Sequence, residues 1–326
     1  MSFYRDDLLH SSKVDHFQDS CQNFLACVIV TYHPDMRVLE QLLQKLPSSA
    51  TIVLVDNGSE TDSIEKIRLL VDELVTGQLV VNNDNHGLAA AVNQGVRWIR
   101  EHCLEIRFVL LLDQDSEPLT GSVERLVQRI NDLEKTTSLV GCVGPNLLDP
   151  RTGLSHGFHQ CTRWRWLRVH PLETSSQPVP CATLNGSGTL VSIDLFCELG
   201  GLDETLFIDH VDTEWSFRVT AAGYALFGIP DAHFIHRMGE NSRRIWLLGW
   251  RVWPMRSPQR HYYLFRNTMI LMRRDYVPRV WKFWSIVKLV LTALIHGVLD
   301  DQRKSQLHYM WSGVCDGVKK GKKIAG

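Results

Sequence analysis

Short apolar runs, each followed by polar residues or glycine, recur through the first third of the chain. They are rich in β-formers and span 26–32, 51–55, 79–82 and 108–112. Segments with helical spacing lie between them, over roughly 35–46, after Ser59 and over 88–100. Strands that alternate with helices in this way predict right-handed βαβ units and a parallel, doubly wound sheet. The fold class predicted is therefore α/β.

The rest of the chain continues the pattern less regularly. A fifth strand is predicted over 138–143, and the segment 150–180 is rich in Gly, Arg and Trp. That segment predicts a hairpin, either a flap that meets substrate or an exposed hairpin stabilised by cross-strand aromatic pairs. A strand over 189–192, a short helix from Ile193, a helix beginning near His210 and a strand over 224–229 follow, and then helices over 260–274 and 280–299.

Polar side chains end the four predicted strands at Thr31, Asp56, Asn85 and Asp113. In an open parallel sheet the ligand crevice lies outside the carboxyl ends of the strands, so these side chains are expected to converge. Asp113 and Asp115 flank Gln114 and form an Asp-x-Asp pair, a pattern typical of a site for a metal and a phosphate. An Asx-type turn is the simpler alternative for this pair.

Neither G-x-G-x-x-G nor G-x-x-x-x-G-K-[ST] occurs, so a nucleotide held through side chains and a metal fits better than a dinucleotide fold or a P-loop. Asp56 is expected to accept hydrogen bonds from a pyrimidine or ribose, or else to cap the next helix. Asn85 and Gly87 precede a helix, where a phosphate can approach the amino terminus or where the chain simply turns.

Three further candidates lie in the second half of the sequence. Gly186 and Ser187 belong to Asn185-Gly-Ser-Gly188, where small residues admit a sugar ring or form a turn. Asp212 falls in the first turn of a predicted helix, which favours its ionised form, although Asp212, Glu214 and Arg218 together also suit a plain helix start. His236 is a candidate metal ligand or a structural hydrogen-bonding residue.

Composition restricts the cellular setting. The 326 residues are 44% hydrophobic and 22% charged, which is ordinary for a globular protein. Eight scattered cysteines without a C-x-x-C pair indicate free thiols in a reducing compartment. Residues 1–24 form a polar arm without the apolar core of a secretory signal, so a cytoplasmic protein is expected.

The end of the chain is basic. From Arg251 onward there are 15 Lys and Arg residues against four Asp residues, whereas the whole chain carries a formal charge of −1. The helix predicted over 280–299 carries a polar stripe on an otherwise apolar surface, formed by Lys282, Ser285, Lys288, Thr292 and His296. Trp281, Trp284 and the lysines near the end favour a helix lying in the interface of the inner membrane over one that packs on the catalytic domain. No nucleic-acid partner is expected.

Several sequence blocks resemble the inverting glycosyltransferases of family 2. Within that family they look like the bacterial branch that uses dTDP-L-rhamnose in the assembly of lipopolysaccharide, O-antigen and rhamnolipid. The blocks run in the family's order from about 26 to 275. They are Val28-Ile-Val-Thr-Tyr, Val55-Asp-Asn-Gly-Ser, Asn85-His-Gly-Leu-Ala-Ala-Ala-Val-Asn-Gln-Gly95, Leu111-Leu-Asp-Gln-Asp-Ser, Gly186-Ser-Gly-Thr-Leu-Val-Ser, Leu206-Phe-Ile-Asp-His-Val-Asp-Thr-Glu-Trp and Tyr262-Tyr-Leu-Phe-Arg-Asn267.

The resemblance implies a GT-A fold, with a mostly parallel nucleotide-binding sheet flanked by helices. It implies a catalytic domain over 25–240, divided into a nucleotide half (25–145) and an acceptor half (146–240), and a basic, amphipathic helical extension over 241–326. It implies Asp113 and Asp115 as ligands of Mg²⁺ or Mn²⁺ with His236 nearby. The donor-binding residues implied are Thr31, Tyr32, Asp56, Asn57, Asn85, Gly87, Asn93, Asp113, Gln114, Gly186 and Ser187.

Asp212 matches the family's catalytic aspartate, although Val211 stands where many relatives have Glu, and this leaves Asp209 as a competitor for the base. The implied reaction moves L-rhamnose from dTDP-β-L-rhamnose to a hydroxyl of a lipid-linked saccharide or glycolipid on the cytoplasmic face of the inner membrane, as an α-L-rhamnoside. The alternatives are a transferase of another nucleotide sugar, a sugar nucleotidyltransferase or a non-catalytic carbohydrate-binding protein.

Overall fold

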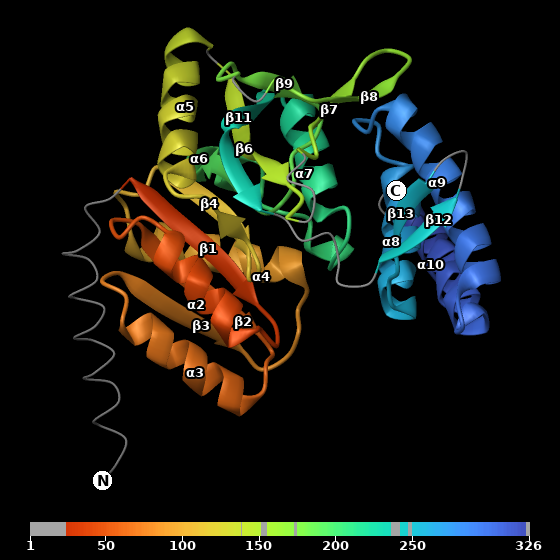
Figure 1. Ribbon diagram of the computed structural model, residues 1–326, viewed down its shortest axis with the longest axis horizontal. Helices are drawn as coiled ribbons and strands as arrows, with labels where there is room; N and C mark the ends of the chain where they lie inside the picture. Colours follow the sequence, from red (N-terminus) through yellow and green to blue (C-terminus); the bar gives the residue numbers. More distant parts are fainter. Residues whose placement is uncertain are drawn as a thin grey trace.

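The computed structural model describes residues 24–137, 139–150, 155–172, 175–235, 242–246 and 250–323 (Figure 1). Its centre is a sheet with the strand order β3-β2-β1-β4-β10-β6-β11-β5, and β9 pairs with β11. The strands are β1 (Leu25–Thr31), β2 (Thr51–Asn57), β3 (Gly77–Asn82), β4 (Phe108–Asp113), β5 (Glu117–Pro118), β6 (Val140–Leu148), β9 (Val179–Cys181), β10 (Thr189–Ser192) and β11 (Ala225–Ile235).

The first four predicted strands are confirmed, and they pair in parallel as β3-β2-β1-β4. Their apolar runs are unbroken because both faces of each strand are covered. In β1, Ala26 and Val28 belong to the hydrophobic core on one face of the sheet, whereas Cys27 and Ile29 belong to the core on the other. This sandwich of the sheet between two cores places the carboxyl ends of the strands at one edge.

Helices cover both faces. The helices α4 (Leu88–His102), α6 (Ile193–Glu198) and α7 (Val211–Ala221) supply residues to one core. The helices α2 (Met36–Lys45), α3 (Thr61–Asp72) and α5 (Ser122–Thr136) supply the other. The predicted α/β fold is therefore confirmed, and α5 is a helix that the sequence pattern did not reveal.

The sheet changes direction after β4. Strand β10 runs antiparallel to both β4 and β6, and β11 runs parallel to β6. The predicted hairpin is also present, as β7 (Phe158–Cys161) paired with β8 (Trp166–Val169). Trp166 packs edge-on against Phe217 of α7, with ring centroids 6.2 Å apart, so the hairpin is attached to the core as well as to itself.

Three helices close the chain and lie beside the sheet (Figure 1): α8 (Pro258–Leu271), α9 (Arg279–Leu299) and α10 (Arg303–Lys323). A short hairpin of β12 (Ser242–Trp246) and β13 (Trp250–Pro254) precedes them. Helix α10 was not predicted. It packs closely on α8 because Gly313 and Gly317 have no Cβ, which would lie 2.4 Å from the carbonyl oxygens of Tyr262 and Arg266.

Helix α9 is oriented with its apolar side outward. Thr292 and His296 from the predicted polar stripe are buried, whereas Phe283 and Val298 are 63% and 71% exposed. By length and composition α9 meets the criteria for a membrane span within the described part of the chain, and 22% of its apolar window is buried. The end of the polar stripe formed by Thr292 and His296 therefore faces the protein, whereas Lys288 is exposed. Trp281, predicted to lie at the membrane interface, is instead buried against the protein, while Trp284 is exposed.

Candidate active site

The ends of β1 and β2 meet at Asp56. The Thr31 hydroxyl donates to Oδ2 of this fully buried carboxylate at 2.9 Å. The Ser59 amide donates to Oδ1 at 2.9 Å, and the Ser59 hydroxyl donates to Oδ2 at 2.6 Å. Helix α3 begins at Thr61, and no side chain caps it, so the helix-cap alternative for Asp56 is not what the structure shows. Asp56 is held rigidly at the strand ends, which is required of a group that recognises a ligand through hydrogen bonds.

Three asparagines link the next strand ends. Asn82 donates to Asn57 at 3.2 Å, and Asn57 donates to Asn85 at 3.0 Å. Asn85 Oδ1 also accepts from the Gly87 amide at 2.9 Å. The amide groups therefore form a connected network along the edge of the sheet, which fixes the loop that leads into α4.

Gly87 has a local structural reason to be glycine. Its φ is +88°, and an added Cβ would lie 2.5 Å from the ring of Phe207. The Leu88 amide at the start of α4 donates to the Phe207 carbonyl at 2.7 Å. The turn alternative thus describes Gly87 better than an amino terminus open to phosphate, because the loop before α7 already covers this helix end.

Gln114 is turned toward β1. Its Oε1 accepts from the Tyr32 amide at 2.7 Å, and its Nε2 donates to the Tyr32 carbonyl at 3.3 Å. This pair of hydrogen bonds ties the loop that carries Asp113 and Asp115 to the neighbouring strand. The two carboxylates consequently project from a constrained turn.

Asp113, Asp115 and Asp212 are close enough to influence one another. The pKa of Asp113 is raised to about 7, mainly by burial and then by the negative charges of Asp115 and Asp212, while Arg260 acts to lower it. Residues 186–188 connect the two sides, because the Gly186 amide donates to Asp212 at 3.3 Å and the Ser187 hydroxyl bonds that of Ser116. Asp212 therefore lies, through residues 186–188, next to the carboxyl end of β4 that carries Asp113.

The acidic pair fits a divalent cation. Two carboxylates one residue apart repel each other, and Arg260 is the cation that opposes the raised pKa of Asp113. Hard oxygen ligands of this kind suit Mg²⁺ or Mn²⁺. No group of three or more His, Cys, Asp or Glu residues is arranged for a metal in the described ranges. His236 lies outside those ranges, so its role as a ligand stays a prediction.

Asp212 lies in the first turn of α7, where the sequence predicted it. The Thr213 amide donates to its Oδ1 at 2.8 Å. Burial raises the pKa of Asp212, and the hydrogen bonds from the Thr213 and Gly186 amides offset only part of that shift. A carboxylate whose proton affinity is increased in this way is suited to accept a proton from a hydroxyl.

Asp209, the competitor for the base, is fully engaged elsewhere. Arg256 donates to its Oδ1 and Arg260 to its Oδ2, each at 2.7 Å. Burial acts to raise the pKa of Asp209, but the two arginines outweigh it and the pKa is lowered. Asp209 therefore anchors two arginines, and Asp212 is the acid left facing the site.

Glu214 and Arg218 have a structural role. Arg218 Nε and Nη2 each donate to the fully buried carboxylate of Glu214 at 2.9 Å. Arg218 also donates to the Gly201 carbonyl at 2.7 Å. These contacts fix α7 against the preceding loop, so Glu214 and Arg218 belong to a plain helix start. Asp212 differs from them because it has no arginine partner among the described residues.

The loop that leads into α7 and Asp212 is held by α8, a feature that sequence reasoning missed. Asn267 Nδ2 donates to the carbonyls of Leu206, Ile208 and Asp209 at 2.7–2.8 Å. The loop needs this support because Phe207, Asp209 and His210 all have positive φ values, between 63° and 64°. The block Tyr262–Asn267 was the available signal, but its contact partner was invisible in the sequence.

Asn93 lies away from the acids. Its Nδ2 donates to the Leu202 carbonyl and to Glu204 Oε1, each at 2.9 Å, and its Oδ1 accepts from the Leu202 amide at 2.8 Å. These bonds join α4 to the loop after α6. Its assignment to donor binding stays a prediction that no contact supports.

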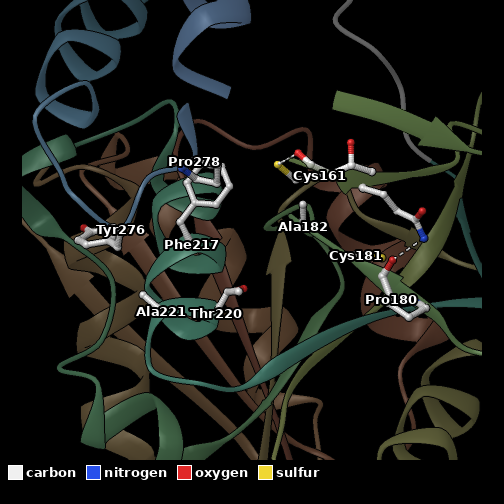
Figure 2. A pocket seen from close by; sticks show the side chains of 11 residues that line it. Cys161, Pro180, Cys181, Ala182, Phe217, Thr220, Ala221, Tyr276 and Pro278 are labelled. Atoms are coloured by element: carbon white, nitrogen blue, oxygen red, sulfur yellow. Dashed lines mark hydrogen bonds between the residues drawn. The ribbon is translucent and has the colours of Figure 1, made fainter. Parts of the chain in front are cut away.

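A cavity of about 540 Å³ opens beside Asp212, a size typical of small-ligand sites. Asn185 and Thr213 line it, and so do Arg168, Arg256 and Lys288. Figure 2 shows a second cavity, of about 430 Å³, against Phe217, Thr220 and Ala221 of α7. The described residues that line it include no acid or cation, so the reactive chemistry belongs to the cavity at Asp212.

Comparisons with known proteins agree with this geometry. The sequence matches glycosyl transferase family 2 over residues 28–200. It is 32% identical over 288 residues to the dTDP-rhamnosyl transferase RfbF of Shigella flexneri, covering 87% of this chain and 90% of that one.

A second relative is the N-acetylglucosaminyl-diphospho-decaprenol L-rhamnosyltransferase of Mycobacterium tuberculosis, 26% identical over 249 residues, which cover 68% of this chain and 78% of that one. The mannosyltransferase PcManGT from Pyrobaculum calidifontis, solved with GDP-Man and Mn²⁺, superposes with a TM-score of 0.54 at 13% identity, over 96% of this chain and 94% of that one. That likeness shows the fold.

Proposed function

The chain belongs to glycosyl transferase family 2, and from that premise we propose that it moves L-rhamnose from dTDP-β-L-rhamnose to a hydroxyl of a lipid-linked saccharide. The observation that carries the proposal is the convergence of Asp212 with Asp113 and Asp115 across residues 186–188. The donor is supported by the similarity to a dTDP-rhamnosyl transferase over most of both chains.

In the proposed reaction, Asp212 accepts the proton of the acceptor hydroxyl as its oxygen attacks the anomeric carbon. The new C–O bond forms on the face opposite the diphosphate, whose C–O bond breaks, so a β-linked donor yields an α-L-rhamnoside. General-base assistance of this kind contributes roughly 10²- to 10⁴-fold to a rate. Asp212 is positioned for it by the Thr213 amide and by the loop that Asn267 holds.

Asp113 and Asp115 would hold Mg²⁺ or Mn²⁺. When bound, the ion supplies positive charge that stabilises the departing dTDP. The Thr31–Asp56 pair and the asparagine network form the rigid edge against which the nucleotide base and ribose would lie. Arg260, which offsets the acids, is itself held by Asp209.

The acceptor and the location follow from the C-terminal helices and from a relative. The mycobacterial relative is named for a decaprenol-linked acceptor, which supports a lipid-linked saccharide here. The outward side of α9 exposes Phe283, Trp284, Val290, Leu294 and Val298. Together with the basic C-terminal segment, this surface fits a peripheral helix on the anionic cytoplasmic face of the inner membrane.

The deciding experiment offers purified protein a panel of dTDP-, UDP- and GDP-sugars with membrane-extracted acceptors and measures the mass of the product. Addition of one deoxyhexose from dTDP-L-rhamnose is expected, and none with the Asp212→Asn variant. Transfer from another donor in the panel would establish the alternative of a different nucleotide sugar, which the fold shared with a GDP-mannose enzyme keeps open.

The membrane proposal has a separate test. Vesicles with anionic lipid should carry the protein on flotation, and replacing Phe283, Val290 and Leu294 together by Ser should release it, because buried apolar area drives such binding. The same replacement at Leu69, Val75 and Leu104, which are exposed apolar residues elsewhere, is the matched control. Flotation that survives the α9 replacement would disprove a role for this surface.

A further inference from the structure

The cavity beside Asp212 has a basic wall. Arg168 reaches it from β8, Lys288 from α9 and Arg256 from the segment before α8, whereas Asp212 is the one acid among its lining residues in the described part of the chain. Figure 1 shows β8 and α9 approaching each other at this place, and the two elements are in contact. The cations therefore come from three separate segments and meet at one space.

Two of these cations have no carboxylate partner. Arg256 pairs with Asp209 at 2.7 Å, but Arg168 and Lys288 form no ion pair with any residue that the structure describes. Arg168 makes a hydrogen bond of 3.3 Å with His159. Within the described ranges, Arg168 and Lys288 therefore bring positive charge to the cavity without a carboxylate bound to either of them.

The electrostatics show the same imbalance. Burial lowers the pKa of Lys288, the neighbouring Arg256 and Arg168 lower it further, and Asp209 opposes them. The pKa of His159 is lowered to about 4, mainly by burial and then by Arg168 and Lys288. Arg168 and Lys288 line the cavity but remain exposed to solvent, and like charges gathered at one opening are stabilised when an anion binds there.

The orientation of α9 is unusual for a helix at the edge of a domain and agrees with this role. Lys288 and Thr292 belong to the polar stripe and both line the cavity, Thr292 as a buried residue and Lys288 as an exposed one. A helix that only packed on the catalytic domain would present its apolar side to it. Here two polar residues of α9 border the cavity instead.

We propose that this cavity is a subsite for a phosphate or diphosphate group of the acceptor, held by Lys288 and Arg168 while the acceptor sugar lies against Asp212. The inference rests on the proposed function, since it takes Asp212 as the base. It adds that the acceptor carries its phosphate next to the sugar that reacts, either as a sugar linked to a lipid through a diphosphate or as a phosphorylated saccharide.

The donor diphosphate is a poor candidate for this subsite. Asp113 and Asp115, which are proposed to place the donor, do not line the cavity, whereas Asp212 does. The basic wall therefore shares its cavity with Asp212 and not with the acidic pair. A ligand that extends from Asp212 into the cavity is therefore the acceptor, whose hydroxyl is the nucleophile.

The first test measures binding of inorganic pyrophosphate by calorimetry, with dTDP present at saturation so that the nucleotide site is occupied. Lys288→Gln and Arg168→Gln are each expected to weaken pyrophosphate binding about 10- to 100-fold, the usual loss for one charge-assisted hydrogen bond. Arg279→Gln on α9 and Arg163→Gln on the β7–β8 hairpin are exposed controls outside the cavity and should change nothing.

The second test compares two acceptors, a sugar 1-diphosphate alkyl ester and the neutral alkyl glycoside of the same sugar. The Lys288→Gln and Arg168→Gln variants should raise KM for the diphosphate acceptor by about the same factor and leave KM for the neutral glycoside and Kd for dTDP unchanged. A saccharide with a phosphate monoester is tested in parallel. If the substitutions raise its KM more than that of the diphosphate acceptor, the subsite takes a phosphorylated core, and the opposite result assigns it to a lipid diphosphate.

The outcomes separate the inference from the proposed function. Pyrophosphate binding that the two substitutions leave intact overturns the subsite, and so does an equal loss with the neutral glycoside. Weaker dTDP binding would assign the cations to the donor and also overturn it. Absence of rhamnosyl transfer to any acceptor would refute the proposed function, while the pyrophosphate measurement, which needs no turnover, would still decide the subsite.

Discussion

The proposed donor side and the proposed acceptor side of the site are built in different ways. On the donor side, the bonds between Thr31 and Asp56 and between Asn57 and Asn85 join residues 25 and 28 positions apart, because β1, β2 and β3 are neighbours in the sheet. The bonds between Tyr32 and Gln114 span 82 positions, because β4 pairs with β1. On the acceptor side, Gly186 and Asp212 are 26 positions apart, Arg256 and Asp209 are 47, and Asn267 and Leu206 are 61. The donor side is thus built from the ends of neighbouring strands, whereas the acceptor side also depends on α8 and the segment before it.

The two sides also differ in charge. Asp113 and Asp115 make the donor side acidic, which suits a cation, whereas Arg168 and Lys288 make the acceptor side basic. Asp212 lies between them. Variants on one side should therefore change one half of the reaction and spare the other, and the following tests depend on that separation.

Asp212→Asn should have the largest effect. We expect the transfer rate to fall by roughly 10²- to 10⁴-fold, because the acceptor loses its base, with the Kd for dTDP nearly unchanged. Initial rates and calorimetry with dTDP measure the two quantities. Asp209→Asn serves as the comparison. Because Asp209 anchors Arg256 and Arg260, its loss should act mainly on the free energy of unfolding and only weakly on the transfer rate of the folded enzyme. Transfer that survives in Asp212→Asn places the base elsewhere.

Chelation of divalent ions should come next. EDTA is expected to lower the transfer rate by about 10³-fold, equivalent to several kcal/mol of lost charge stabilisation, and Mg²⁺ or Mn²⁺ should restore it. Asp115→Asn should weaken the response to added metal, whereas Asp62→Asn, on the first turn of α3, should not. Equal dTDP affinity with and without metal would argue against a metal at this pair.

Asn267→Leu tests the support of the acceptor side. Losing three hydrogen bonds to loop carbonyls should lower the free energy of unfolding by about 2–4 kcal/mol. It should lower the transfer rate about tenfold or more while dTDP still binds, because only the loop with Asp212 is released. Denaturant unfolding and rate measurements check this, with Asn131→Leu on α5 as a distant control. A parallel loss of dTDP affinity would show that the two sides are not separable.

Asp56→Asn tests the donor side alone. The carboxylate accepts three hydrogen bonds through two oxygens, whereas an amide has one acceptor oxygen and must lose one of them. We therefore expect dTDP to bind about tenfold more weakly, the value of one hydrogen bond to a charged group. Asp35→Asn, which retains a good cap for α2, is the control. Unchanged dTDP affinity would remove Asp56 from the nucleotide site.

The smallest effect concerns pH. Because burial raises the pKa of Asp212, its ionised form costs stability in the folded protein, and this cost is present at neutral pH and lost as the pH falls through the raised pKa. Asp212→Asn should therefore be slightly more stable than the wild type at neutral pH, with the difference vanishing in acid. Urea titrations between pH 4 and 8 measure it, and an increase of the difference toward acid would contradict the assignment.

The sequence predicted most of the donor side for a physical reason. A strand buried on both faces appears as a continuous apolar run, and the carboxyl ends of parallel strands meet at one edge whatever the helices between them do. Asp56, Asn85 and Asp113 could therefore be placed together from the order of the strands alone. At Gly87 the sequence left a turn and a phosphate-binding amino terminus as alternatives, because the ring of Phe207 that packs against it lies far along the chain.

The acceptor side was predicted only in part. Asp212 was named from its place in a helix start and from its match to the family's catalytic aspartate, with Asp209 left as a competitor. The ion pairs that engage Asp209, with Arg256 and Arg260, could not be read from the sequence. Helix α10 was missed because Gly313 and Gly317 lower helix propensity, and their purpose appears only where α8 packs against them. The polar stripe on α9 was predicted from the sequence, but which of its residues turn toward the protein was not.

By itself, the sequence determined the α/β layers, the parallel strand ends and the acids they carry, since these follow from periodicity and from neighbouring segments. Tertiary structure alone decided which aspartate is free to act, which side of α9 faces the protein and that Arg168 and Lys288 share a cavity. Those outcomes depend on contacts between distant segments, and such contacts are set by how the whole chain packs rather than by any local pattern.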